Sequence, residues 1–131
     1  MGTTNLWNAS IFEYQKESAV SVTNDATMQQ VCQLVTSNLP AGTYYISYSF
    51  EVDFNSTKNT PAYFALSGTY ADAEEFAVIA SGDAAADNIN RSYGFPKYWD
   101  GGVMTITLNM RRDSVTNFDC DFVDIMVERK A

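Results

Sequence analysis

Histidine is absent from this 131-residue chain, and its absence removes much of the usual chemistry of enzymes. Without it there is no Ser-His or Cys-His nucleophile pair, no histidine general base and no histidine metal ligand. The serines also lack a G-x-S-x-G turn, and the glycines form neither a G-x-G-x-x-G motif nor a Walker motif. The sequence therefore predicts a protein that is not an enzyme and that uses no metal and no cofactor.

Basic residues are scarce as well. Eight Lys and Arg stand against sixteen Asp and Glu, which gives a net charge of -8. Such a chain repels phosphate backbones, so we expect no nucleic acid partner. Long apolar runs are also missing, which predicts no membrane partner. The first ten residues carry no signal peptide, so we expect synthesis and retention in the cytoplasm.

Only two cysteines occur, Cys32 and Cys120, and both lie in strand-like segments. They lack the C-x-x-C spacing of zinc and redox sites. We expect reduced, partly buried packing residues. A disulfide that joins the first and last strands is the alternative.

Carboxylates are plentiful, but most of them follow the pattern of a solvent-facing strand. Asp119 and Asp121 alternate with Phe118, Cys120 and Phe122. This alternation is typical of a strand with one buried face and one wet face. We therefore expect structural roles for these acids, as for Asp72, Glu74, Glu75 and Asp124.

Two other groups of acids suggest a chemical function, one as metal ligands and one as catalytic carboxylates. The segment 83–88 offers oxygen ligands without the spacing of a calcium loop. Glu51 and Asp53 lie on one face of a strand, roughly 7 Å apart, which is within the range of an inverting glycosidase. Carbohydrate hydrolysis on a β-scaffold is thus an alternative from the enzyme class.

Strict alternation marks the clearest strands. In residues 44–54 every even position is apolar or aromatic, and most odd positions are polar. Residues 103–110 alternate in the same way. Both segments predict long strands with one buried face.

The remaining pattern also indicates short strands separated by turns. Residues 28–36, 62–70 and 75–80 read as strands, with a helix over 71–80 as an alternative, and residues 81–90 read as a loop. In residues 117–128 the apolar positions change phase, which predicts a β-bulge near Phe122 and Val123. With about eight strands, the expected fold class is all-β, an antiparallel β-sandwich.

Aromatic residues gather in two other segments. The segment 93–100 contains Gly94 and Pro96 and is predicted to be a loop, and the residues near the N-terminus are otherwise polar. Aromatics in such places fill the end of a sandwich or a subunit interface, or they contact a protein or a glycan. The candidate contact residues are Trp7, Phe12, Tyr93, Phe95, Tyr98 and Trp99.

Three segments carry a resemblance to a known family. Residues 39–51 read LPAGTYYISYSFE, residues 101–108 form a Gly-led alternating strand, and residues 123–129 end in VDIMVER. Together they resemble small jelly-roll proteins on the virion surface of tailed bacteriophages, which include capsid decoration proteins and fibre tips with a tumour-necrosis-factor-like fold.

The resemblance implies a jelly roll over residues 17–131, preceded by an N-terminal arm and first strand over residues 1–16. It also implies a homotrimer that is made in the host cytoplasm and placed on the virion surface. The short arm favours a decoration protein that binds major capsid protein subunits and stabilises the head shell. A receptor-binding tip that recognises host glycans is the alternative.

Overall fold

The computed structural model describes residues 11–53, 61–70, 76–79, 88–112 and 118–130. This part of the chain contains eight strands and no helix, and therefore no helix that could span a membrane. The strands are β1 (Phe12–Val22), β2 (Gln29–Leu39), β3 (Gly42–Asp53), β4 (Pro61–Gly68), β5 (Phe76–Ile79), β6 (Asn88–Trp99), β7 (Gly102–Arg112) and β8 (Phe118–Arg129).

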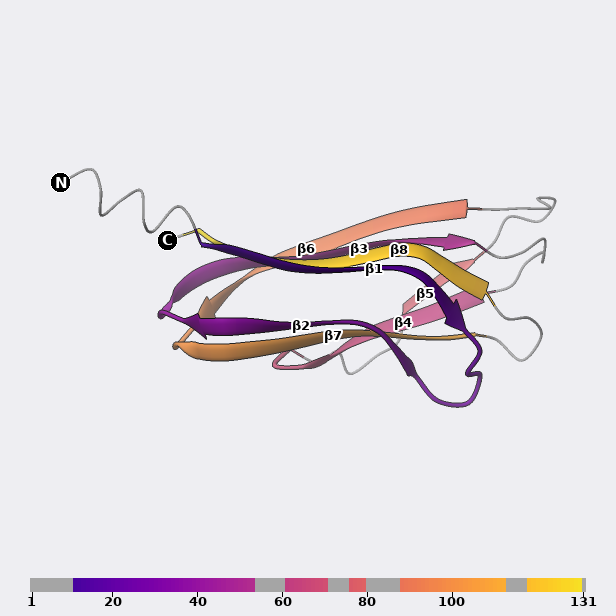
Figure 1. Cartoon of the computed structure of the whole chain (residues 1–131), viewed down its shortest axis with the longest axis horizontal. Coiled ribbons are helices and arrows are strands. Elements are labelled where there is room, and N and C mark those ends of the chain that lie inside the picture. Colours follow the sequence, from indigo (N-terminus) through magenta and orange to yellow (C-terminus); the bar gives the residue numbers. More distant parts are fainter. Residues whose placement is uncertain (1–10, 54–60, 71–75, 80–87, 113–117, 131) are drawn as a thin grey trace.

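The strands form two four-stranded antiparallel sheets that pack face to face (Figure 1). One sheet has the order β1-β8-β3-β6 and the other has the order β2-β7-β4-β5. Consecutive strands thus alternate between the sheets in the jelly-roll manner, except β4 and β5, which pair within one sheet. The predicted all-β sandwich is confirmed, as is its jelly-roll topology.

The core lies between the two sheets and follows from the alternation. In β3 the even residues from Tyr44 to Val52 are at most 5% exposed. Burial of a tyrosine requires a partner for its hydroxyl, and Tyr44 donates a hydrogen bond to the carbonyl of Pro40 at 2.7 Å. Buried Thr36 is satisfied in the same way, because its hydroxyl accepts from the Met104 N–H at 2.9 Å and donates to the Ser37 carbonyl.

A β-bulge interrupts β8 beside the predicted position. Glu51 of β3 pairs with Phe122 and Val52 pairs with Cys120, so Asp121 is the extra residue. The bulge turns Phe122 outward, where it is 42% exposed, while Cys120 and Val123 stay buried. β1 pairs with β8 on both sides of the bulge, and Ala19 of β1, which lies between these paired residues, has a φ of 55°. The bulge is the physical reason for the change of phase in the sequence.

The predicted loop over 93–100 is wrong, because these residues lie in β6 as far as Trp99. β6 pairs with β3 along its whole length and forms one edge of its sheet. An edge strand tolerates proline, since it has a ladder partner on one side only. Gly94 and Pro96 therefore do not end this strand.

Smaller differences concern other predicted segments. Phe12 begins β1 instead of lying in an arm, and β1 continues to Val22, across the expected boundary at residue 16. Residues 76–79 form strand β5, so the helical alternative is wrong there. The predicted loop 81–90 gives way to β6 from Asn88 onward. Residues 80–87, which include most of the calcium-like segment, lie outside the described residues.

Candidate functional site

One end of the sandwich carries the most exposed of the large apolar side chains that the structure describes. At this end, which we call the terminal end, β1 begins, β8 ends, and the β2–β3 and β6–β7 turns lie (Figure 1). The most exposed large apolar side chains of the described residues all lie toward it: Tyr98 64%, Val35 56%, Tyr14 55%, Val103 51% and Phe12 48%. Their concentration at one end makes this end the candidate contact surface.

Three aromatics form the part of this surface that belongs to the β1-β8-β3-β6 sheet. We call Phe12, Tyr14 and Tyr98 the terminal patch. The rings of Phe12 and Tyr14 lie 5.8 Å apart on edge strand β1, and Tyr98 lies on the opposite edge strand, β6. Exposed aromatics of this kind supply much of the binding energy at protein interfaces.

The other predicted contact residues of β6 point inward. The Tyr93 ring lies 5.3 Å from Phe64 and 5.5 Å from Tyr48, within the aromatic cluster between the sheets. Phe95 and Trp99 pack against the core, and the indole of Trp99 donates to the Gly102 carbonyl at 3.2 Å. These three side chains close one side of the sandwich. Trp7 lies outside the described residues.

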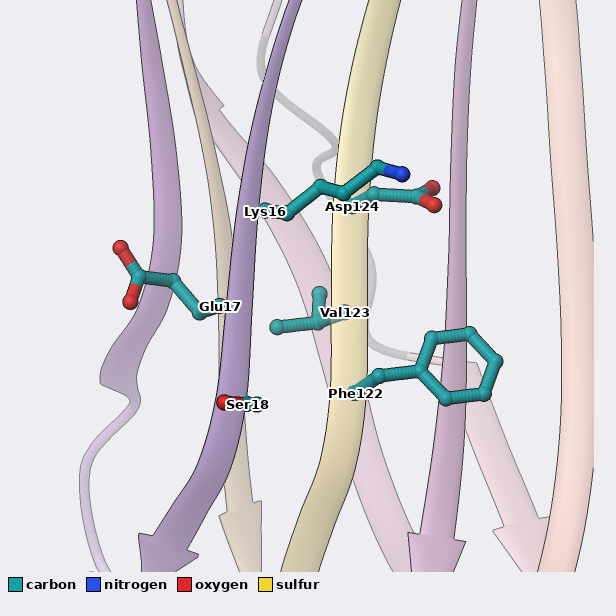
Figure 2. A pocket seen from close by; sticks show the side chains of 6 residues that line it. All are labelled: Lys16, Glu17, Ser18, Phe122, Val123 and Asp124. Atoms are coloured by element: carbon teal, nitrogen blue, oxygen red, sulfur yellow. The ribbon is translucent and has the colours of Figure 1, made fainter.

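A hollow of about 440 Å³ lies on the outer face of the same sheet, beside the bulge. Figure 2 shows Lys16 reaching from β1 toward Asp124 of β8, with Phe122 on the same side of that strand. Asp124 accepts a hydrogen bond from the Ser49 hydroxyl at 2.5 Å. Ser18 completes this polar surface beside an exposed aromatic ring.

A second hollow of about 240 Å³ lies over the β3–β6 pair. Its lining includes Ser47, Ser49 and Ser92, with Met126 at one side. Tyr45 rests its hydroxyl end on Gly94, where an added Cβ would lie 2.3 Å from the tyrosine oxygen. The glycine therefore allows the ring to lie across the two strands.

Three acidic residues, Asp53, Asp119 and Asp121, lie toward the other end of this face. Asp53 of β3 pairs with Asp119 of β8, which accepts a hydrogen bond from Ser21 at 2.8 Å. Burial, and then the charges of Asp53 and Asp119, raise the pKa of Asp121. Glu51 and Asp53 line neither hollow. Among the described residues no group of acids and cysteines is arranged to hold a metal ion.

Both cysteines are free and buried, so the disulfide alternative is wrong. The Cys32 thiol donates to the Gln15 carbonyl at 3.6 Å, and the Cys120 sulfur lies 3.2 Å from the Met110 sulfur. Burial, assisted by nearby carboxylates, raises the pKa of each thiol from 9.0 to about 12. The thiolate, which is the nucleophile, is therefore suppressed in the folded protein.

We expect the folded protein to resist Ellman's reagent below pH 9 and to react at both cysteines once urea unfolds it. The unfolded thiols ionise near their ordinary pKa of 9.0, and the folded thiols ionise only near 12. The stability contributed by the protonated thiols is present below pH 9 and is lost as the pH rises toward 12. Native labelling at the unfolded rate would contradict this picture.

Comparisons with known proteins support the fold. No family model and no curated protein sequence matches the chain. Among solved structures, PRD1 vertex protein P5 matches with a TM-score of 0.52 at 10% identity, over 92% of this chain and 96% of that one. Eiger TNF from S. frugiperda matches with a TM-score of 0.54 at 10% identity, over 92% of this chain and 93% of that one.

A T=1 particle derived from infectious bursal virus gives a further match. Its protein has a TM-score of 0.58 at 8% identity, over 92% of this chain and 32% of that one. At such identities the likeness concerns the fold alone. The chain is thus a jelly roll of the type found in virus particle proteins and in a TNF protein.

Proposed function

We propose that this chain is a non-enzymatic structural protein of a virion surface, and that it decorates a capsid by binding major capsid protein subunits. The observation that carries the proposal is the concentration of exposed apolar side chains at the terminal end. The fold shared with a viral vertex protein and a virus particle protein supports it.

Attachment by the terminal end has a physical rationale. Burial of Tyr98 and Phe12 against a capsid removes apolar area from water, and each contact recurs at every binding site on the shell. A ligand that binds only the assembled shell stabilises that shell by mass action. No reaction is needed for this role.

Shells that lack the chain provide the test. Purified protein is added to them, and occupancy and melting temperature are measured. We expect the double variant Phe12→Ser with Tyr98→Ser to bind at least about tenfold more weakly, because two exposed aromatic anchors are removed. Phe122→Ser is the matched control, since it removes a similarly exposed ring far from the terminal end. Equal melting temperatures of shells with and without the chain would refute the stabilising role.

The proposed trimer is tested separately. Sedimentation equilibrium of the purified chain should give three times the 14.5 kDa chain mass. A monomer at every concentration would refute the trimer and leave the decoration role to the shell experiment.

A further inference from the structure

The two hollows on the outer face of the β1-β8-β3-β6 sheet lie beside each other, because Ser49, which lines the second, donates a hydrogen bond to Asp124, which lines the first. Lys16 pairs with Asp124, and Ser49 pairs with Asp124 on one side and with Ser92 on the other. This row crosses all four strands, a span of about 14 Å at the usual strand spacing. We call the surface along this row the transverse groove and include in it these lining residues of the two hollows: Lys16, Ser18, Tyr45, Ser47, Ser49, Ser92, Gly94, Phe122, Asp124 and Met126.

The side chains of the groove combine hydrogen-bonding groups with apolar rings. Serine hydroxyls both donate and accept, Lys16 only donates, and ionised Asp124 only accepts. Exposed rings stand at two places along the groove, with Tyr45 38% exposed and Phe122 42% exposed. A ligand that matches this lining has many hydroxyls and also apolar faces that stack on rings. Sugars have both properties.

We propose that the transverse groove binds a neutral oligosaccharide. The charge of the chain selects against acidic glycans, because the net charge is -8 and Asp53, Asp119 and Asp121 lie farther along the same face. The lining of the second hollow suits a ligand with both kinds of surface, because Ser47, Ser49 and Ser92 offer hydroxyls and Tyr45 and Met126 offer apolar faces.

Backbone features fix both rings before any ligand arrives. The bulge at Asp121 turns Phe122 outward, and the missing Cβ of Gly94 gives Tyr45 its resting place. Bulges commonly redirect a side chain at a functional site. Rings that are already in position lose little conformational freedom on binding, which favours affinity.

The groove adjoins the terminal patch at one end and leads away from it at the other. Through β8, Phe12 shares a cross-strand row with Tyr45, and Tyr14 shares one with Ser47. Phe122 lies on the other side of the groove's central row, so a chain attached by its terminal end leaves the part of the groove beside Phe122 free. Glycan binding therefore goes beyond shell decoration, and each activity can fail without the other.

The test is an NMR titration of the full chain with three probes, maltotriose, cellotriose and tri-N-acetylchitotriose. We expect at least one probe to cause saturable shifts of the Ser49, Ser92 and Asp124 amides. Phe122→Ser should weaken that binding about tenfold, as expected for the loss of one stacked ring. Tyr98→Ser should leave it unchanged, the reverse of the pattern expected for shell binding.

Ser49→Ala is a second variant that preserves the packing. It removes the hydroxyl that donates a hydrogen bond to Asp124, so it should also lower the affinity for the sugar without unfolding the chain. The proposal is overturned if none of the three probes causes saturable shifts. It is also overturned if the shifts centre on the terminal patch, or if sialyllactose binds more tightly than the neutral probes.

Discussion

Replacing Phe50 with alanine should lower the free energy of unfolding by about 3–5 kcal/mol, the usual cost of removing a buried phenylalanine. Phe50 is 1% exposed, and its ring meets Phe64 edge-on at a centroid distance of 5.1 Å. Tyr93 of the edge strand lies 6.4 Å away on the same cluster. The variant loses apolar burial and these ring contacts together. Urea unfolding followed by tryptophan fluorescence measures the loss.

Phe122→Ala is the matched control for this cavity. Its ring is 42% exposed, so its removal leaves no internal void and should cost less than about 1 kcal/mol. Similar losses in the two variants would mean that the aromatic cluster does not form the core.

The strands that alternation predicted are those buried on one face. β3 and β7 have this form, because their outer faces meet water and their inner faces meet the opposite sheet. The bulge in β8 was also predictable, since an extra residue reverses the parity of every later side chain. Local sequence carries this information because the period of a strand is two residues.

β6 escaped prediction for a physical reason. Tyr93, Phe95 and Trp99 do alternate, but Gly94 and Pro96 stand between them. These residues end most strands, and only an edge position in the sheet makes them acceptable. Which strand lies at an edge depends on long-range pairing, so the local sequence favoured a loop.

The contact residues that were predicted to share one loop lie instead on both faces of β6, because successive side chains of a strand point to opposite faces. Tyr98 is 64% exposed, whereas Phe95 and Trp99, on the other face of the same strand, pack against the core. The transverse groove was missed altogether, because the residues that meet there come from four strands. Its one sequence signal was the change of phase at Phe122, which indicated a bulge and not yet a site.

Replacing Gly68 with alanine should lower the free energy of unfolding by at least about 3 kcal/mol, through backbone strain, a steric collision and a lost hydrogen bond. Gly68 has a φ of +95°, which side chains rarely adopt, and an added Cβ would lie 2.3 Å from the Thr105 carbonyl oxygen. The same oxygen accepts the Thr69 N–H at 2.7 Å. β4 must move away from β7 to make room, which disturbs the sheet beside the core.

Gly101→Ala measures the cost of backbone strain at a positive φ without a steric clash. Gly101 has a similar φ of +108°, but its added Cβ would lie 3.5 Å from the nearest atom, an ordinary contact. This variant should cost only about 1–2 kcal/mol, the price of a left-handed backbone for a residue with a side chain. The difference between the two unfolding free energies measures the collision with β7. Equal costs would show that β4 moves freely, which would contradict the close packing of β4 against β7 at Thr105.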